Sequence, residues 1–348
     1  MINHPRCCWA AKQRSSQGDF VMTPILTRRT LVHTGLATAA ALPLIGTSAW
    51  AQAWPAKPIK IVCSVPAGGI TDLFARAYGE YLSKQLGQPV VVENKPGAGG
   101  SLAALAVKAS PADGYTLLFA LSGTFGTNRV IYKNLAYDPD KDFVLISTIS
   151  NGSIVLAAHK STGATNVREF VEYARKNKTN IGTWGAGTNS HMVVAELNKQ
   201  FGLQIEAVHY GRLMWPDFDA GVIQAAQGVY YNTINSAQTG TGRVIAVWPK
   251  RSSKLPDVPT FTEQGVTSRL FGMKGYVGLA GPSGMPQAIV ERLSALMVEG
   301  GKTERVQKIL DTQAIDEAAI GHVEAKALHE REVPVWIELV TSLGLTPQ

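Results

Sequence analysis

The sequence predicts an α/β protein of two lobes, each built on a mixed, mostly parallel sheet flanked by helices. Two series of alternating strand-like and helix-like segments follow one another along the chain, which is the pattern of parallel sheets joined by helical crossovers. About 300 residues remain after an N-terminal leader, too many for one compact core and natural for two. Glycine-rich loops follow several of the strand-like segments, at the position where ligands bind in parallel sheets.

The first series begins with a β-branched strand over residues 59–64. A loop then leads into a helix whose apolar residues recur at helical spacing and which ends at Gly87. A second strand covers residues 90–94, and a further glycine-rich loop enters a helix with Ser101 as its expected N-cap. A third strand follows at residues 115–121. Three strands that alternate with two helices predict a parallel sheet.

The second series begins with a strand at residues 154–158 and a helix at 167–176, which Asn166 is expected to cap. Further strands are expected at 180–183, 205–209, 228–231, 244–248 and 276–280, with a helix at 190–200 and a short helix after 256–260. Helical patterns at 286–298, 303–312 and 323–343 complete the chain. These segments predict that residues 52–154 and 276–348 form the first lobe and residues 155–275 the second.

The N-terminus carries the features of an export signal. Arg28 and Arg29 precede an apolar run at residues 36–45, the arrangement of a twin-arginine leader. The small residues around Trp50 suit a signal peptidase, so residues 1–51 are expected to be removed and the mature protein to be periplasmic. Met22 is an alternative start, because the segment before it is long for such a leader. The apolar run is too short to cross a bilayer.

Composition excludes several function classes. The net charge is +7, but the leader holds five basic residues and one acidic residue, so 28 basic and 25 acidic residues remain in the mature chain. No block of lysine and arginine survives to suggest a nucleic-acid partner or stable membrane insertion. Cys63 is then the single cysteine, which excludes an internal disulfide and favours a buried core position. A soluble monomer is expected.

No cofactor or metal is expected. The histidines show no spacing typical of a metal site, and the acidic segment 138–142 lacks the glycine and the distal glutamate of a calcium-binding loop. We therefore interpret that segment as a solvated turn. The chain also lacks a Walker loop, a dinucleotide-binding glycine motif and a nucleophile elbow, and nothing pairs His191 with a nucleophile. These absences argue against an enzyme.

Three loops are candidates for a ligand site. They follow expected strands at residues 65–72, 122–128 and 185–191, and each combines glycine with hydroxyl or amide side chains. Glycine lets the backbone approach a ligand, and free N–H groups at helix N-termini with Ser and Thr hydroxyls are donors that a carboxylate accepts from. Four or five such hydrogen bonds at roughly 1.5–3 kcal/mol each can reach the roughly 8 kcal/mol of micromolar binding. A small carboxylate is therefore the predicted ligand.

Several motifs together resemble one family. They are Pro66-Ala67-Gly68-Gly69-Ile70-Thr71-Asp72, Glu93-Asn94-Lys95-Pro96-Gly97-Ala98-Gly99-Gly100, Asp113-Gly114-Tyr115-Thr116-Leu117, Tyr137-Asp138-Pro139-Asp140-Lys141-Asp142-Phe143, Asn189-Ser190-His191 and Leu255-Pro256-Asp257-Val258-Pro259-Thr260. In this respect the chain is similar to the Bug-type receptors of tripartite tricarboxylate transporters, over residues 54–348. The resemblance implies a type II periplasmic-binding-protein fold, closure of two lobes over a carboxylate, and membrane permease subunits as partners.

The resemblance also implies the ligand-binding residues. The positions that match are Ala67, Gly68, Gly69, Asp72, Ser122, Gly123, Thr124, Thr188, Asn189, Ser190 and His191, of which Asp72 is alternatively a helix cap. The chain departs from the family pattern around Arg212 and at Tyr230 and Tyr231, where an acidic residue that would suit an ammonium group is missing. Amino acids are therefore less suitable ligands.

Two interpretations of these departures remain open. In one, Tyr230, Tyr231, Trp215 or His209 lines an aromatic pocket and Arg212 pairs with a distal carboxylate, so that an aromatic carboxylate binds. In the other, the aromatic residues belong to the core of the second lobe, Arg212 is solvated, and an aliphatic dicarboxylate is equally suitable. The competing functions are a receptor for transport, a sensor component, and an exported α/β enzyme such as a hydrolase of a carboxylate ester.

Overall fold

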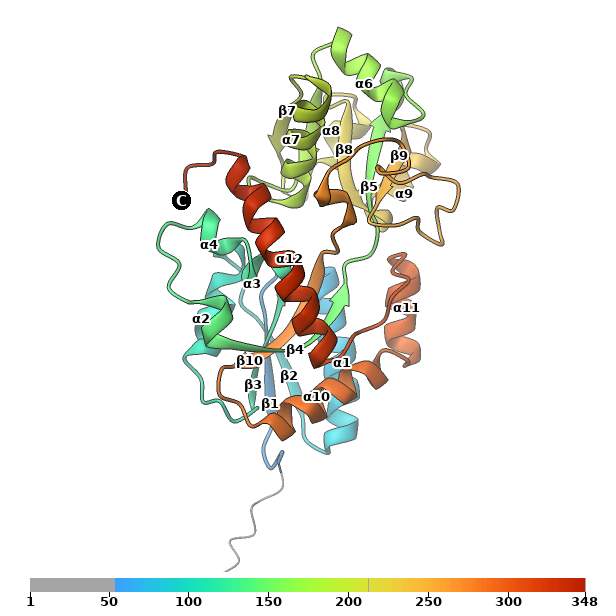
Figure 1. The fold of residues 1–348 in the computed structure, drawn as a ribbon. Coiled ribbons are helices and arrows are strands. Elements are labelled where there is room, and N and C mark those ends of the chain that lie inside the picture. The colour runs from blue at the N-terminus through green and yellow to red at the C-terminus, as the bar shows by residue number, and fades with distance from the viewer. Residues whose placement is uncertain (1–53, 212, 348) are drawn as a thin grey trace, which may run out of the picture. The chain divides into compact units, whose positions relative to one another are not determined.

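The computed structural model describes residues 54–211 and 213–347, which belong to one compact unit. The leader at residues 1–51 and Arg212 therefore lie outside the described residues. The described part of the chain forms two five-stranded sheets with helices on their faces (Figure 1). None of its helices is both long enough and apolar enough to cross a membrane.

The first sheet has the strand order β2-β1-β3-β10-β4. Its strands are β1 (Ile59–Cys63), β2 (Val90–Asn94), β3 (Thr116–Leu121), β4 (Phe143–Ser150) and β10 (Tyr276–Pro282). β1 is parallel to β2 and β3, whereas β10 is antiparallel to both β3 and β4. The single antiparallel strand returns from a distant part of the chain, so the predicted mixed, mostly parallel sheet is confirmed.

The second sheet repeats this plan with the order β7-β6-β8-β5-β9. Its strands are β5 (Ile154–His159), β6 (Asn180–Thr183), β7 (Glu206–His209), β8 (Ala225–Val229) and β9 (Gly242–Trp248). Here β6 is parallel to β7 and β8, and β5 is antiparallel to β8 and β9. By position in the sheet, β6 corresponds to β1, β7 to β2 and β8 to β3. The loops after corresponding strands can therefore be compared residue by residue.

Both faces of the first sheet are covered. On one face, α1 (Ile70–Leu86), α10 (Gln287–Gly300) and α11 (Glu304–Thr312) bury an apolar cluster that includes Phe74 and Leu293. On the other face, α2 (Ser101–Lys108) packs through alanines and Val107 against Val62 and Leu118. α3 (Ser122–Phe125), α4 (Asn128–Ile131) and α5 (Pro139–Asp142) are single turns that follow β3 and precede β4, and η1 (Ala98–Gly100) precedes α2.

The second sheet has a large and a small cluster. α6 (Val167–Lys176), α7 (Asn189–Phe201) and η3 (Arg269–Gly272) contribute to the large one, in which Trp248 stands edge-on to Phe261 and Phe271 at 5.8 Å between ring centroids. α8 (Trp215–Asp219) provides Phe218 to the small one. α9 (Tyr230–Gln238) follows β8, and η2 (Lys160–Thr162) follows β5.

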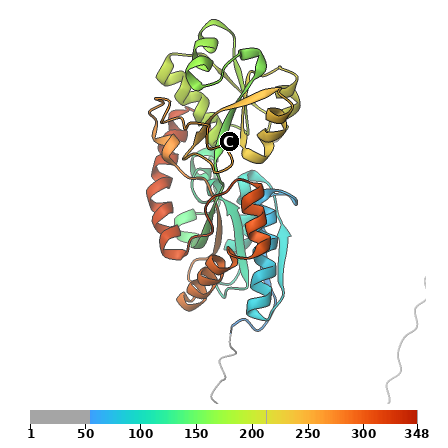
Figure 2. The same ribbon diagram turned by 90° about the vertical axis from the view of Figure 1, so that its right-hand side faces the viewer.

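The long helix α12 (His322–Ser342) runs alongside both sheets (Figures 1 and 2). Near its start, Leu328 packs with side chains of the first sheet. Near its end, Trp336, Leu339 and Val340 join the large cluster of the second sheet. α12 therefore packs against apolar clusters of both sheets.

Some sequence predictions of local structure were wrong. β4 was not predicted, and residues 230–231, which were expected to be strand, begin helix α9 because β8 ends at Val229. Residues 261–265, where a short helix was expected, form only a turn, which Gly265 ends with φ of +81°. Gly100, not Ser101, is the N-cap of α2, and the hydroxyl of Ser101 accepts a hydrogen bond from Asn128.

Candidate functional site

Four helices follow the carboxyl ends of parallel strands, two of them after a loop and two immediately. They are α1 and α3 after β1 and β3 of the first sheet, and α7 and α9 after the corresponding β6 and β8 of the second. Within the described residues, none of their N-cap residues makes a side-chain cap hydrogen bond; these are Gly69, Leu121, Thr188 and Val229. Asn166, in contrast, caps α6 as predicted. The strand ends therefore present backbone donors that suit an anion.

The loop between β1 and α1 is held by Asp72. Gly68 has φ of +83°, and its N–H donates to Asp72 Oδ2 at 2.9 Å. Arg76 Nε donates to the same oxygen at 3.0 Å, and Asn94 Nδ2 donates to Oδ1 at 2.7 Å. Asp72 is only 2% exposed, so both of its oxygens serve the loop. Ala67 and Gly68 remain exposed, while Gly69 is buried.

These hydrogen bonds also set the charge of Asp72. Burial by itself would raise the pKa of this carboxyl, but the hydrogen bonds from Arg76, Gly68 and Asn94 outweigh burial and lower the pKa below its usual range. The side chain is therefore ionised at neutral pH and fully engaged. Asp72 is the third residue of α1, not its N-cap, and it organises the loop rather than capping the helix.

The loop between β6 and α7 has the same construction with a different side chain. Gly187 has φ of +73°, and its N–H donates to Nδ1 of His191 at 3.3 Å. His191 is the third residue of α7, as Asp72 is of α1, and in both loops the donor lies four residues earlier. The structure thus places a histidine in the second sheet where the first has an aspartate.

His191 is neutral and has one free donor. Burial and the neighbouring His209 lower the pKa of His191 below its ordinary value, so the ring is uncharged at neutral pH. Its Nδ1 accepts from Gly187, which places the ring proton on Nε2. Within the described residues, Nε2 has no hydrogen-bond partner. The His209 ring lies edge-on to it at 4.9 Å between centroids and is itself held by Thr183 Oγ1 at 2.6 Å from Nδ1.

The other predicted residues of this loop divide into two groups. Thr188 Oγ1 donates to the carbonyl oxygen of Gly185 at 2.7 Å and lies 2.9 Å from Ser190 Oγ, which in turn accepts from Trp184 N–H at 2.9 Å. Ser190 is fully buried. These two hydroxyls therefore fix the loop. Asn189 is half-buried and its amide has no partner in the described part of the chain, so it remains available to a ligand.

The loop after β3 shows the same division. Thr124 is 1% exposed and its hydroxyl donates to the carbonyl oxygen of Gly99 at 3.0 Å, where Asn128 Nδ2 also donates at 3.0 Å. Gly100 lies so close to Thr124 that a Cβ there would be 2.3 Å from the hydroxyl oxygen. Ser122 and Gly123 are half-buried, and the Ser122 hydroxyl has no partner among the described residues.

The predicted aromatic residues do not form one group. Trp215 is half-buried and packs edge-on to Phe218 at 5.7 Å, and a Cβ at Gly228 would lie 2.6 Å from its ring. Tyr230 is half-buried at the start of α9, Tyr231 follows it in the same helix, and His209 is exposed at the end of β7. Arg212 lies outside the described residues.

Sequence reasoning missed the polar residues behind the loops. Asn94 ends β2 and holds Asp72, Arg76 pairs with Asp72 from the next turn of α1, and Asn128 anchors Gly99. The position of Asn94 at a strand end was a signal that could have identified it. Asn128 carried no such signal, because its partner lies far away in the sequence.

The fold has solved relatives. The chain is similar to the R. palustris protein Rpa4515, solved with adipate, with a TM-score of 0.73 and 27% identity over 85% of this chain and 100% of that one. It is also similar to the periplasmic binding protein BugD, with a TM-score of 0.70 and 28% identity over 85% of this chain and 100% of that one. A third is MatC from Rhodopseudomonas palustris with bound malate, with a TM-score of 0.68 and 27% identity over 82% and 100% of the two chains. The predicted two-lobed fold is thereby confirmed.

The sequence comparison agrees. A UPF0065 protein from the ttuE-ttuC' intergenic region of Agrobacterium vitis is 34% identical over 265 residues, which cover 74% of this chain and 75% of that protein. Residues 74–345 match the family model described as the tripartite tricarboxylate transporter family receptor. The likeness to BugD confirms the Bug-type resemblance. The chain therefore belongs to the family of solute-binding receptors of tripartite tricarboxylate transporters.

Proposed function

We propose that this receptor captures a small carboxylate with the loops at the carboxyl ends of β1, β3 and β6 and delivers it to the membrane permease subunits of a tripartite transporter. The observation that carries the proposal is the pair of matching loops around Gly68 and Gly187. In each, the glycine N–H donates to the side chain of the third residue of the following helix, and other groups of the loop remain available to a ligand. On this proposal, residues 52–154 and 276–348 form one lobe and residues 155–275 the other.

The free groups at these loops are hydrogen-bond donors. They include the backbone N–H of Ala67, the hydroxyl of Ser122, the amide of Asn189 and Nε2–H of His191. Asp72 is the one buried carboxylate among the predicted residues. Both of its oxygens accept hydrogen bonds, so its negative charge repels a bound anion less than the charge of a free carboxylate would. Neutral, preoriented donors suit a carboxylate, whose lone pairs accept several hydrogen bonds at once.

Most of the remaining predicted residues support the loops in this proposal without contacting the ligand. The residues that shape the loops are Gly69, Gly123, Asp72, Thr124, Thr188 and Ser190. Tyr230 and Tyr231 are proposed to line the second-lobe side of the site, where the corresponding position of the first lobe has Ser122 and Gly123. Arg212 is proposed to line the same side. The ligand thus meets donors from both lobes.

An aliphatic dicarboxylate is the preferred ligand class. The two similar proteins were solved with adipate and with malate, both aliphatic dicarboxylates. Trp215, a proposed wall of an aromatic pocket, packs instead against Phe218 and Gly228. An aromatic carboxylate is the second candidate, which the half-buried ring of Tyr230 favours. The leader at residues 1–51 supports export by the twin-arginine route, and we propose a periplasmic, monomeric protein without cofactor or catalytic activity.

A thermal-shift screen of residues 52–348 tests the ligand class. The panel contains adipate, malate, phthalate, aspartate and a carboxylate ester, each at concentrations up to a few millimolar. A ligand at a hundredfold excess over its Kd stabilises the folded state by about 2.7 kcal/mol. We expect a shift from a dicarboxylate, recovered unchanged, and none from aspartate. Hydrolysis of the ester would favour the enzyme alternative, and no shift from any carboxylate would contradict the proposal.

One pair of variants locates the binding. Asn189→Ala removes an amide that is proposed to contact the ligand and should weaken binding of the selected carboxylate about tenfold, the usual effect of losing a hydrogen bond to a charged group. Asn134→Ala removes the same amide at an exposed position outside the three loop segments and should change nothing. Equal affinities of the two variants would exclude Asn189 from the site.

A further inference from the structure

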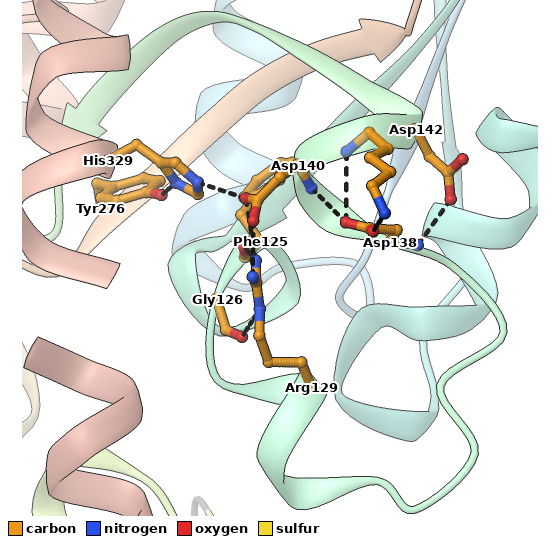
Figure 3. Close-up of polar contacts among 9 residues, drawn as sticks. Phe125, Gly126, Arg129, Asp138, Asp140, Asp142, Tyr276 and His329 are labelled. Carbon is orange, nitrogen blue, oxygen red and sulfur yellow. Dashed lines mark hydrogen bonds and ion pairs between the residues drawn. The ribbon is translucent and has the colours of Figure 1, made fainter. Parts of the chain in front are cut away.

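The acidic segment 138–142 is not only a solvated turn, as the sequence suggested. Asp138 caps the short helix α5 by accepting from the N–H groups of Asp140 at 3.1 Å and Lys141 at 3.3 Å. Figure 3 shows Asp140 held between Arg129 of α4 and His329 of α12. The segment thus brings one carboxylate between two elements that are far apart in the sequence.

Asp140 and Arg129 form a two-point ion pair. Arg129 Nη1 lies 2.6 Å from Asp140 Oδ2, and Nη2 lies 3.0 Å from Oδ1. The pair lowers the pKa of Asp140 and raises that of Arg129, as expected for charges that stabilise one another. Because a guanidinium is planar and its donors are fixed, this contact sets the orientation of Arg129 as well as its charge.

Arg129 uses its remaining donors on the backbone behind the candidate ligand loop. Nε donates to the carbonyl oxygen of Gly126 at 3.1 Å, and Nη2 donates to that of Phe125 at 3.2 Å. The carbonyl oxygen of Thr124 accepts from the Tyr137 hydroxyl at 2.7 Å. Three consecutive carbonyl groups that follow Ser122 and Gly123 are therefore held by side chains, and the turn between β3 and α4 cannot rotate freely.

His329 continues the contacts to α12. Its Nε2 lies 3.2 Å from Asp140 Oδ1, and its Nδ1 lies 2.7 Å from the hydroxyl of Tyr276, the first residue of β10. Tyr276 is 1% exposed, so this end of the chain of contacts is anchored in the core. α12 in turn places Trp336 in the large cluster of the second sheet.

We propose that Arg129 and Asp140 are positioning residues of the ligand site. They fix the backbone of Phe125 and Gly126 and thereby hold the preceding turn at residues 122–124 in the form that binds the carboxylate, and His329 ties Asp140 to α12. The inference rests on the proposed function, because it assumes that Ser122 contacts the ligand. Arg129 and Asp140 differ from the proposed ligand-binding residues, because they act through the backbone and do not contact the ligand.

The test compares four variants with the wild-type chain of residues 52–348. Arg129→Ala removes the pair, Arg129→Lys keeps the charge but not the two-carbonyl contact, and Asp140→Asn weakens the hold on Arg129. Arg251→Ala is the matched control, because Arg251 also contacts a carboxylate, that of Glu263 at 3.0 Å, and a carbonyl oxygen, that of Pro256 at 2.9 Å, but follows β9 away from the ligand loops.

The first readout is hydrogen–deuterium exchange of the ligand-free proteins. In the peptide that spans residues 121–127, we expect exchange about tenfold faster in Arg129→Ala, an intermediate increase in Arg129→Lys and Asp140→Asn, and none in Arg251→Ala. Unchanged exchange in Arg129→Ala would overturn the proposal. This readout needs no ligand, so it decides the positioning role even if no carboxylate binds and the proposed function fails.

The second readout is the Kd for adipate by titration calorimetry. Where the wild-type chain binds adipate, Arg129→Ala should bind about tenfold more weakly, Arg129→Lys should recover part of the loss, and Arg251→Ala should match the wild type. Faster exchange in Arg129→Ala with an unchanged Kd would overturn the proposal, because the segment would then be loosened without any consequence for binding.

Discussion

The hydrogen bonds of Asp72 predict a large loss of stability in Asp72→Asn. The carboxylate accepts three hydrogen bonds, from Gly68, Arg76 and Asn94, at 2.9, 3.0 and 2.7 Å. All three partners are donors, so the amide group of an asparagine must face a donor on one side. The substitution therefore replaces a hydrogen bond by a repulsive contact and removes the charge that strengthens the others.

The magnitude follows from the burial of this side chain. Hydrogen bonds to charged groups contribute about 1.5–3 kcal/mol each, and a neutral acceptor gives about half of that. One lost and two weakened hydrogen bonds at a side chain only 3% exposed predict a decrease of about 3 kcal/mol in the free energy of unfolding. Urea denaturation, followed by tryptophan fluorescence at pH 7, measures it.

A matched control is Glu172→Gln. Glu172 pairs with Arg168 one helical turn away at 3.3 Å, but its side chain is 54% exposed. The expected cost is below about 0.5 kcal/mol, as for other exposed pairs. An Asp72→Asn variant no less stable than Glu172→Gln would refute the role that we assign to Asp72.

The same prediction has a pH dependence. The pKa of Asp72 is lowered in the folded protein from an ordinary value of 3.8, so its ionised form stabilises the fold at all pH values above that value. This contribution is lost as the pH falls through the folded-state pKa. The difference in stability between wild type and Asp72→Asn should be constant from pH 7 to 5 and shrink below the ordinary value.

Three further substitutions or reactions test the packing. Gly100→Ala should lower the free energy of unfolding by about 3 kcal/mol or more, because the new Cβ would lie 2.3 Å from Thr124 Oγ1. Gly87→Ala, with φ of +64° and no described atom within 4 Å of its Cβ, should lower it only by the roughly 1–2 kcal/mol of left-handed strain. Equal melting temperatures of the two variants would contradict this. Gln227→Leu should raise the melting temperature, since neither amide atom of this fully buried side chain has a hydrogen-bond partner among the described residues. A lower melting temperature would show that they have one. Cys63 is fully buried and burial raises its pKa, so the mature protein should react with a thiol reagent at least a hundredfold more slowly when folded than in urea; rapid stoichiometric reaction of the folded chain would contradict this placement.

The sheets could be predicted from sequence because their signals are local. The strand before Gly68, for example, is a short β-branched run, and a glycine-containing loop then leads into residues at helical spacing. The helix at Tyr230 could not be predicted in this way. Aromatic residues favour strands, but β8 ends at Val229, and the Thr233 hydroxyl then bonds back to the carbonyl oxygen of Tyr230 at 2.8 Å.

The turn after Pro259 illustrates a local signal that misleads. Thr260 and Glu263 exchange hydrogen bonds, N–H to carboxylate at 2.6 Å and N–H to hydroxyl at 3.1 Å, as at the start of a helix. Gly265, with φ of +81°, ends the turn before a helix forms. A start signal without a following helical stretch therefore gives only one turn.

The site could be located from sequence but not resolved. Strand ends identified the loops, yet sequence alone could not tell which polar side chains hold a loop and which remain free. Asp72, Thr124 and Ser190 are used by the fold, whereas Asn189 and His191 keep free donors. The difference depends on partners elsewhere in the chain, such as Asn94 and Gly99, which only the folded structure brings together.

The central claim is that the ligand binds at the loops after β1, β3 and β6. Hydrogen–deuterium exchange of residues 52–348, with and without saturating adipate, tests this most directly. We predict that adipate slows exchange in peptides that cover residues 66–72, 122–126 and 185–192 and leaves the surface groove around residues 132–142 unchanged. Protection of that groove, which includes Tyr132, Lys133 and Lys141, without protection of the three loops would contradict the account.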